Sequence, residues 1–386
     1  MSRSMDPEQA VRDRYSRAAD RVELALCCPT QYDPRYLELI PAEVLEKDYG
    51  CGDPSAYAEP GQTVLDLGSG GGKICYIASQ IVGPEGRVIG VDFNDDMLAV
   101  AEKYRGEMAD RLGYANVEFR KGYIQNLRRD LRAVDRRLEQ HPPRTSRDLA
   151  ELEAQAREQE RERPLVADES VDLVVSNCVL NLVRPEEKDR LFSEIYRVLR
   201  NGGRAVISDI VADEDVPQAM RDDPELWSGC ISGALRDEAF LSSFLRAGFH
   251  GVEVLSWSDD PWRTVDGIEF RSMTVSAYKG KVGPCWERHQ AVIYKGPWSA
   301  VEDDDHHRYE RGRRVAVCDK TFNLLRRGPY AADLIFLEPS EAVSLDQAEP
   351  FDCSRTEDRH PRELKERGYR VTGGASECCG SDAGCC

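Results

Sequence analysis

The stretch Thr63-Val-Leu-Asp-Leu-Gly-Ser-Gly-Gly-Gly-Lys-Ile-Cys-Tyr-Ile-Ala78 decides the fold of this chain. Its apolar first part predicts a buried parallel strand, its glycines a tight turn, and its last part the start of a helix. Because glycine has no Cβ, Gly68, Gly70 and Gly72 allow the backbone to turn sharply and to approach a ligand closely. The stretch therefore predicts a strand, a turn and a helix around a nucleotide-type ligand.

Residues 87–92 predict a second strand, which ends in Asp92. A carboxylate at that position can accept hydrogen bonds from both hydroxyls of a ribose. Asp66 stands two residues before the first glycine, and the resulting Asp-x-Gly-x-Gly-x-Gly pattern resembles the first motif of class I methyltransferases that depend on S-adenosylmethionine. That resemblance implies that the glycine loop faces the methionine part of the cofactor and that Asp92 holds its ribose. For the glycine pattern alone, a structural turn in any α/β domain is the alternative.

Composition sets limits on partners and size. The chain has 386 residues, of which 41% are hydrophobic, enough for one sizeable α/β domain and a smaller one. A net charge of −18 opposes nucleic acid as a partner, since phosphate binding needs clustered cations. The beginning has no apolar signal core and no 18 apolar residues run together, so we expect no membrane partner and a cytoplasmic protein.

The succession of patterns predicts the domain organisation. We expect an N-terminal helical and loop segment over residues 1–60, an S-adenosylmethionine-binding domain over 61–279, a smaller α+β domain over 280–375 and a flexible cysteine-rich tail over 376–386. The fold class is thus α/β, a Rossmann-like class I methyltransferase sheet with a smaller α+β carboxy-terminal domain. Residues 7–26 predict an amphipathic surface helix. The charged insertion 128–163 predicts solvated helices, one of them started by a capping box at Thr145 and Asp148.

The remaining elements follow from periodicity. Further strands are expected at 116–120, 170–177, 204–209, 252–257 and 273–277, and helices at 41–47, 95–112, 187–200 and 240–247.

Thirteen cysteines need an explanation, because a reducing compartment does not favour structural disulfides. Cys75 and Cys318 suit the role of small buried hydrophobic residues. Cys51 lies between two glycines and before Asp-Pro, which predicts an exposed, mobile loop. Cys178 follows the fourth strand, where open α/β sheets bind ligands. Cys230 lies among small residues that leave room for a substrate.

Three cysteine motifs together resemble those of the arsenite methyltransferases: Tyr-Gly-Cys-Gly-Asp-Pro, Ser-Asn-Cys-Val-Leu-Asn-Leu and Gly-Cys-Ile-Ser-Gly-Ala-Leu. The likeness covers roughly residues 10–337. It implies that Cys178 and Cys230 bind trivalent arsenic, with Cys51 as a further arsenic ligand, and that Cys51 and an earlier cysteine, Cys28 or Cys27, assist as thiols during turnover. The expected cofactor site comprises Tyr49, Asp66, Gly68, Gly70, Gly72, Asp92, Phe93, Met97, Ile124, Gln125 and Asn177.

The chemistry of arsenic agrees with this resemblance. Trivalent arsenic is soft and prefers thiolates, as soft metals do, and it keeps a lone pair when three sulfurs bind it. That lone pair can attack the sulfonium methyl of S-adenosylmethionine, so proximity rather than a general base lowers the barrier. Methylation oxidises arsenic, and thiols can return two electrons by closing a disulfide. We expect Cys51 to serve this exchange, and a thiol reductant of the thioredoxin or glutathione type to restore the thiols.

Two other functions remain open from the residues. One is methylation of a small organic acceptor such as a quinone precursor, with incidental cysteines. The other is a thiol-based arsenic-binding protein without catalysis, against which the intact Asp66, glycine loop and Asp92 argue. Further along, the acidic and histidine run 302–307 is interpreted as a solvated loop rather than a metal site. The terminal cysteines either collect arsenic, accept electrons or belong to an inert tail.

Overall fold

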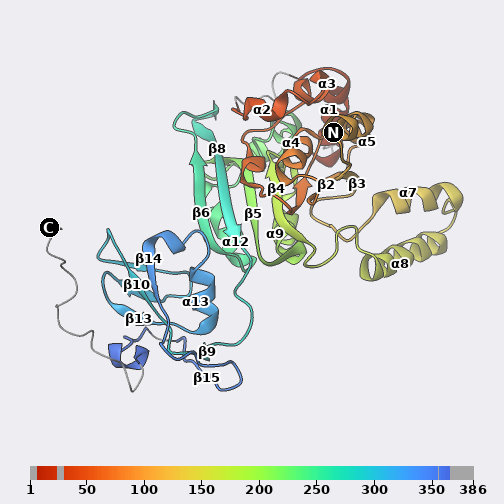
Figure 1. Ribbon diagram of the computed structural model, residues 1–386. Coiled ribbons are helices and arrows are strands. Elements are labelled where there is room, and N and C mark those ends of the chain that lie inside the picture. The colour runs from red at the N-terminus through yellow and green to blue at the C-terminus, as the bar shows by residue number, and fades with distance from the viewer. Residues whose placement is uncertain (1–6, 24–29, 355, 366–386) are drawn as a thin grey trace. The chain divides into compact units, whose positions relative to one another are not determined.

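A computed structural model describes residues 7–23, 30–354 and 356–365 of the chain. The chain divides into two compact units, Met1–Gly280 and Lys281–Cys386 (Figure 1). None of the described helices combines the length and the apolar character needed to cross a bilayer.

The first unit is built on one mixed sheet. Its strand order is β3-β2-β1-β4-β5-β8-β6, with β7 paired to β8. The strands from β1 to β5 run parallel, whereas β8 is antiparallel to β5, β6 and β7. The bounds are β1 Thr63–Leu67, β2 Arg87–Asp92, β3 Val117–Lys121, β4 Val171–Asn177, β5 Leu199–Ala212, β6 His250–Trp257, β7 Arg263–Val265 and β8 Ile268–Tyr278. All seven predicted strands are present, and the three-residue β7 was not predicted.

Helices flank this sheet. They are α1 Pro7–Asp20, α2 Pro34–Leu37, α3 Ala42–Glu46, α4 Lys73–Val82, α5 Asp95–Lys103, α6 Arg105–Leu112, α9 Pro185–Val198, α10 Gln218–Arg221, α11 Pro224–Ser228 and α12 Asp237–Arg246, with short 3₁₀ turns η2 Pro54–Tyr57 and η3 Leu180–Leu182. The single helix predicted over 95–112 is wrong in one respect: it divides at Tyr104 into α5 and α6. The predicted N-terminal helix is shorter than expected, because α1 ends at Asp20.

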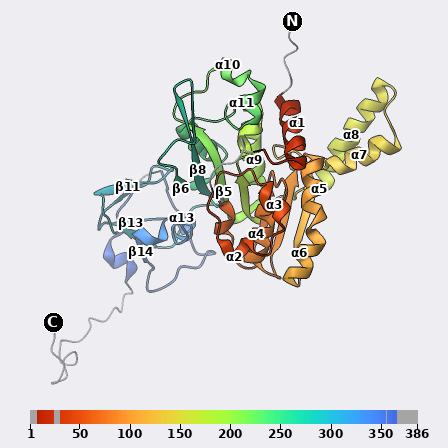
Figure 2. The same ribbon diagram turned by 90° about the horizontal axis from the view of Figure 1, so that it is seen from above.

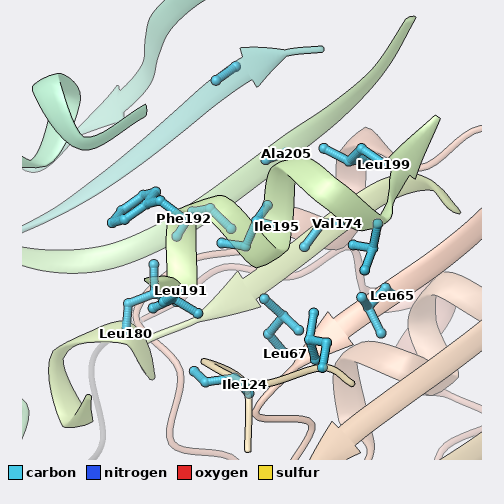
Figure 3. Packing of buried hydrophobic residues seen from close by; sticks show 14 of the residues in the cluster. Leu65, Leu67, Ile124, Val174, Leu180, Leu191, Phe192, Ile195, Leu199 and Ala205 are labelled. Atoms are coloured by element: carbon cyan, nitrogen blue, oxygen red, sulfur yellow. The ribbon is translucent and has the colours of Figure 1, made fainter. Parts of the chain in front are cut away.

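Alternating side chains of β1 serve two different cores. Leu65 and Leu67 join the apolar cluster beneath α9 and α12, and Figure 3 shows α9 packed over these strands. Val64 joins the cluster on the other face, with residues of α4, the helix labelled in Figure 2. Because strand side chains alternate, Asp66 points toward the α4 face, together with Val64. The glycine loop that follows β1 lies where the strand order reverses, between β2 and β4, which is where open α/β sheets bind ligands.

The insertion forms a pair of helices, α7 Leu131–Gln140 and α8 Ser146–Glu162 (Figure 1). The predicted capping box is present: the Thr145 side chain accepts from the Asp148 N–H at 3.2 Å, and Asp148 accepts from the Thr145 N–H at 3.0 Å. Ala156 is the one buried residue in the two helices, so both are largely solvated, as predicted.

The second unit is a small α+β fold. A three-stranded sheet of order β13-β10-β14 is accompanied by the pairs β11-β12 and β9-β15. The elements are β9 Trp286–Glu287, β10 Ala291–Tyr294, β11 Ala300–Glu302, β12 Arg308–Glu310, β13 Arg314–Ala316, α13 Asp319–Leu325, β14 Leu334–Leu337 and β15 Glu349–Pro350, with 3₁₀ turns η4 Ala331–Asp333 and η5 Pro361–Leu364. Val292, Val315 and Phe322 form the centre of its own apolar core.

Candidate active site

The glycine loop has the geometry of a ligand cradle. Gly68 and Gly70 have φ of +71° and +48°, a region that disfavours a side chain. A Cβ on Gly68 would lie 2.4 Å from a methyl carbon of Val179, so only glycine fits there. Between these glycines, the Oγ of Ser69 is buried and has no hydrogen-bond partner. Such an orphaned hydroxyl is a natural partner for a bound ligand.

Two buried carboxylates lie behind this loop. Asp92 accepts from the N–H of Gly70 and from the N–H of Asn94, each at 2.9 Å, which fixes it at the end of β2. Burial raises the pKa of Asp92, although the backbone N–H groups oppose the shift. Burial also raises the pKa of Asp66 to about 7, and the charge of Asp92 adds to that effect. The thiol of Cys75 donates to Asp66 at 3.3 Å, and Cys75 is fully buried, as predicted.

A cavity with an empty volume of about 1100 Å³, part of it open to solvent, lies in front of the loop. Most residues predicted for the cofactor line it: Tyr49, Asp66, Gly68, Gly70, Asp92, Phe93, Met97, Ile124, Gln125 and Asn177, together with Cys178. Gly72 does not line it. Gly72 is the N-cap of α4, and its α-carbon faces Phe119 and Tyr76 in the core, so glycine is required there for packing.

The N-terminal helix α1 also lines this cavity, which the sequence did not indicate. Glu8, Val11 and Tyr15 of α1 lie along its wall, and Glu8 forms an ion pair with Arg184 at 3.2 Å. The predicted amphipathic helix is present, but its apolar face has two uses: Val11 and Tyr15 line the cavity, whereas Ala18 and Ala19 pack into the apolar core. No local signal separates these two uses, because both need the same helical spacing.

Cys178 and Cys230 occupy matching backbone conformations. Their φ values are +63° and +62°, a left-handed region that costs a non-glycine residue of order 1–3 kcal/mol. The thiol of Cys230 donates to the carbonyl oxygen of Cys178 at 3.2 Å, so the two residues are in contact. Both are 3% exposed. Cys51, Cys178 and Cys230 belong to the same buried apolar cluster, and of these three cysteines Cys178 lines the cavity.

Cys51 contradicts the prediction of an exposed, mobile loop. It is 5% exposed, and Asn177 anchors its loop by accepting from the N–H of Cys51 at 2.8 Å and of Gly52 at 3.1 Å. The flanking glycines are needed for close packing rather than for flexibility. A Cβ on Gly50 would lie 2.0 Å from the Asn177 amide nitrogen, and one on Gly52 would lie 2.5 Å from the Ser208 hydroxyl.

The small residues around Cys230 have a similar purpose. A Cβ on Gly233 would lie 1.8 Å from the carbonyl oxygen of Asn181, so the segment packs tightly instead of leaving an open approach. On its other side, the hydroxyl of Tyr15 lies 3.8 Å from the Cys230 sulfur. Burial raises the pKa of Tyr15, so its hydroxyl stays protonated. The expectation of unobstructed access at Cys230 is therefore wrong.

Two buried charged side chains, Lys188 and Asp209, hold the chain just after Cys178. Lys188 donates to the carbonyl oxygen of Leu180 at 2.7 Å, and Asp209 accepts from the backbone N–H of Leu180 at 2.8 Å. Burial lowers the pKa of Lys188 to about 8 and raises that of Asp209 to about 6. Neither residue was predicted. The sequence did offer one signal for Asp209, because it is a charged residue near the end of a strand whose second half is mostly apolar.

Two other predictions concern the cysteines near the two ends of the chain and the acidic and histidine run 302–307. Cys27 and Cys28 lie outside the described residues, as do the terminal cysteines 378, 379, 385 and 386. In the acidic run, His307 pairs with Asp303 at 3.0 Å, and its other ring nitrogen contacts the carbonyl oxygen of Cys353 at 3.0 Å. Both ring nitrogens of His307 are therefore engaged in contacts within the second unit.

Comparisons with known proteins bear on this site. A methyltransferase domain model matches residues 58–137 and 139–263, and a domain of unknown function matches residues 281–369. The arsenite methyltransferase of Aquipseudomonas alcaligenes is 32% identical over 350 residues, which cover 85% of this chain and 90% of that protein. The chain belongs to the arsenite methyltransferase family.

Other members of the family agree. The arsenite methyltransferase of Mus musculus is 29% identical, over 90% of this chain and 88% of that protein. The crystal structure of an arsenic(III) S-adenosylmethionine methyltransferase from Chlamydomonas reinhardtii superposes with a TM-score of 0.55 at 28% identity, covering 84% of this chain and all of that one. The resemblance found in the cysteine motifs and the predicted fold class are both confirmed.

Proposed function

We propose that this arsenite methyltransferase family member transfers a methyl group from S-adenosylmethionine to trivalent arsenic bound by Cys178 and Cys230. One observation carries the proposal: Cys178 lies both on the wall of the cavity at the glycine loop and in contact with Cys230. A group held by these two sulfurs lies at the edge of the cavity. The substrates are arsenite and methylated trivalent arsenicals.

The residues at the cavity suit S-adenosylmethionine. Its sulfonium supplies an electrophilic methyl group. The glycine loop gives room for the backbone to approach a ligand and offers the buried Ser69 hydroxyl, and the carboxylate of Asp92, held by the Gly70 N–H, can accept from ribose hydroxyls. Phe93, Met97 and Ile124 offer apolar surface on the same wall. We assign Tyr49, Asp66, Gln125 and Asn177 to the same site.

The cysteines hold the arsenic and exclude water from it. Soft thiolates replace the oxygens of arsenite, which leave as water with the protons of the thiols. The site is apolar, with Ile210, Ile231 and Phe270 packed around the three cysteines. Fixed sulfur positions then present the arsenic lone pair toward the cavity without a general base.

Thiols complete the turnover. Methylation takes arsenic from the trivalent to the pentavalent state, and two thiols that close a disulfide return two electrons and release two protons. Cys51 is assigned to this exchange and as a further arsenic ligand, with Cys28 or Cys27 as the earlier thiol. A reductant of the thioredoxin or glutathione type then reopens the disulfide.

The test is a direct assay of product. The purified protein is incubated with arsenite, a thiol and methyl-labelled S-adenosylmethionine, and labelled arsenicals are separated by chromatography. Labelled methylarsenicals support the proposal. Label transferred to a quinone precursor and not to arsenic would instead establish the small organic acceptor, and arsenic bound without any transfer would establish the non-catalytic alternative.

A further inference from the structure

The second unit contains a thiol cluster that the proposed methyl transfer does not use. The sulfur atoms of Cys285, Cys318 and Cys353 all lie within 4.8 Å of one another. In the described part of the chain, no other set of three cysteine, histidine or acidic side chains comes this close together. In particular, Cys51, Cys178 and Cys230 are not gathered so tightly.

Three separate elements bring these thiols together. Cys285 immediately precedes β9 and Cys353 follows β15, and these two strands pair antiparallel, with Phe351 donating to the carbonyl oxygen of Cys285 at 2.9 Å. Cys318 is the N-cap residue of α13, where its sulfur accepts from the N–H of Thr321 at 3.3 Å. The cluster therefore depends on the tertiary fold and on no local sequence motif.

The cluster is not explained as core packing alone. Cys318 is fully buried, as predicted, but Cys285 and Cys353 are only half-buried and can be reached from solvent. None of the three forms a disulfide with another described residue. Cysteines that serve as small hydrophobic residues do not need their sulfurs to converge at the surface.

The surroundings shift the pKa values of two of these thiols in opposite directions. Burial opposes ionisation of Cys285, but hydrogen bonds from Cys353 and Cys318 and the charge of Lys320 outweigh it and lower the pKa of Cys285. Conversely, burial and the neighbouring sulfurs raise the pKa of Cys353. The close approach of the three sulfurs, and not the ionisation of any one of them, is what marks the cluster as a place for a thiophilic ion.

We propose that Cys285, Cys318 and Cys353 form a second site for trivalent arsenic, a three-sulfur site separate from the site of methyl transfer. The choice of arsenic rests on the proposed function, and the number of ligands supports it. Structural zinc takes four protein ligands. Among the described residues, no fourth cysteine, histidine or carboxylate joins this cluster, and the nearby ring of His307 is engaged by Asp303 and by the Cys353 carbonyl. Trivalent arsenic takes three sulfurs and keeps a lone pair.

Binding at this site is an exchange without redox change. Each of the three arsenic–oxygen bonds of arsenite is replaced by an arsenic–sulfur bond. The three thiol protons leave with the three hydroxyl groups as three water molecules. Where Cys285 is already ionised, solvent supplies the third proton.

The experiment uses the full chain with Cys178 and Cys230 both changed to serine, kept reduced by a phosphine. After incubation with arsenite and desalting, bound arsenic is measured by mass spectrometry and its ligands by X-ray absorption. We expect one tightly held arsenic per chain with three sulfur neighbours, and its loss when Cys285→Ser or Cys353→Ser is added. These two positions are chosen because Cys318 is fully buried and caps a helix, so its replacement tests folding as well.

Controls separate this site from the other thiols. Lys320→Met keeps all three sulfurs and should keep the arsenic, and so should a variant with serine at 378, 379, 385 and 386. Loss of that arsenic in the tail variant, with retention in Cys285→Ser, would overturn the proposal. So would a zinc ion that arsenite cannot displace.

The outcome is independent of methyl transfer. The background variant already lacks the two proposed catalytic thiols, so arsenic retained there supports the second site even if the protein methylates nothing. Cys285→Ser in the otherwise native chain should methylate at the native rate with saturating arsenite. A native rate there, with no arsenic held by the background variant, overturns the second site and leaves the proposed function standing.

Discussion

The two groups of cysteines in this protein differ in how they are held. In the first unit Cys178 and Cys230 are buried, take left-handed backbone conformations and contact each other through the Cys230 thiol and the Cys178 carbonyl. In the second unit, three sulfurs lie within 4.8 Å of one another, and two of their residues are half-buried. In the first unit, Cys178 lies beside a cavity and contacts Cys230, whereas in the second unit three sulfurs converge on one position.

This difference suggests that arsenic reacts at the cysteines of the first unit and is held tightly, without reacting, at those of the second unit. A substrate that must react and leave is served by sulfurs at the edge of a cavity, with strain in the backbone that holds them. A preassembled set of three sulfurs loses little conformational freedom on binding and favours tight retention. The comparison predicts that the same substitution, cysteine to serine, has opposite consequences in the two units.

The largest effect is expected at the proposed site of methyl transfer. Cys178→Ser or Cys230→Ser replaces a soft ligand by a hard one and should lower methylation by more than about 100-fold, the loss that a small misplacement of reacting groups already causes. Binding of S-adenosylmethionine, measured by calorimetry, should stay unchanged. The matched substitution Cys285→Ser should keep the native rate. Equal losses in both units would abolish the distinction.

Cys51 tests whether the buried cluster acts as a pair or as a set of three. Arsenite offers three exchangeable oxygens, but a monomethylated trivalent arsenical offers two, which Cys178 and Cys230 can fill alone. Cys51→Ser should therefore lose methylation of arsenite and retain part of the methylation of methylarsenite, as followed by product analysis.

A strong reductant that reduces arsenic directly should restore only the redox part of that defect. Cys353→Ser, which changes a thiol of the second unit, serves as the control and should affect neither substrate. Full rates on both substrates with a weak reductant, or equal loss on both, would falsify this role of Cys51.

What the sequence predicted well depended on local patterns. The strand before the glycines and the acid at the end of β2 follow from the apolar runs and the glycines, all within a few neighbours along the chain. Gly68 and Gly70 have the positive φ that a sharp turn requires, so their prediction rested on a local need. The resemblance in the cysteine motifs added the family.

What it missed depended on contacts between distant segments. The loop of Cys51 looked mobile, because two flanking glycines are a common sign of flexibility, yet they make room for Asn177 and Ser208. The convergence of Cys285, Cys318 and Cys353 has no spacing signal, because three elements far apart in the chain create it. Local propensity carries no information about either contact.

Substitution of Asp92 tests whether S-adenosylmethionine binds to the first unit independently of arsenic binding in the second unit. Asp92→Ala should weaken binding of S-adenosylmethionine by about 1.5–3 kcal/mol for each charge-assisted hydrogen bond lost, which calorimetry can measure. Asp95→Ala is the control, since Asp95 is three residues away and pairs with Lys121 at 2.7 Å. Arsenic held by the second unit should be unaffected by either change. An unchanged cofactor affinity in Asp92→Ala removes this residue from the site.

The smallest expected effect compares the hydroxyl groups that lie beside the sulfurs. Tyr15 lies 3.8 Å from the Cys230 sulfur, and the Thr321 hydroxyl lies 3.2 Å from the Cys318 sulfur. A neutral hydrogen bond contributes about 0.5–1.5 kcal/mol, so each deletion should cost roughly threefold to tenfold. Tyr15→Phe should lower the methylation rate by that factor and leave the arsenic of the second unit in place. Thr321→Val should do the reverse, weakening arsenic retention while methylation continues at the native rate. Since both changes preserve side-chain volume, circular dichroism should report native folding for each. If either substitution changed both readouts equally, the two groups of thiols would act on one pool of bound arsenic rather than on two.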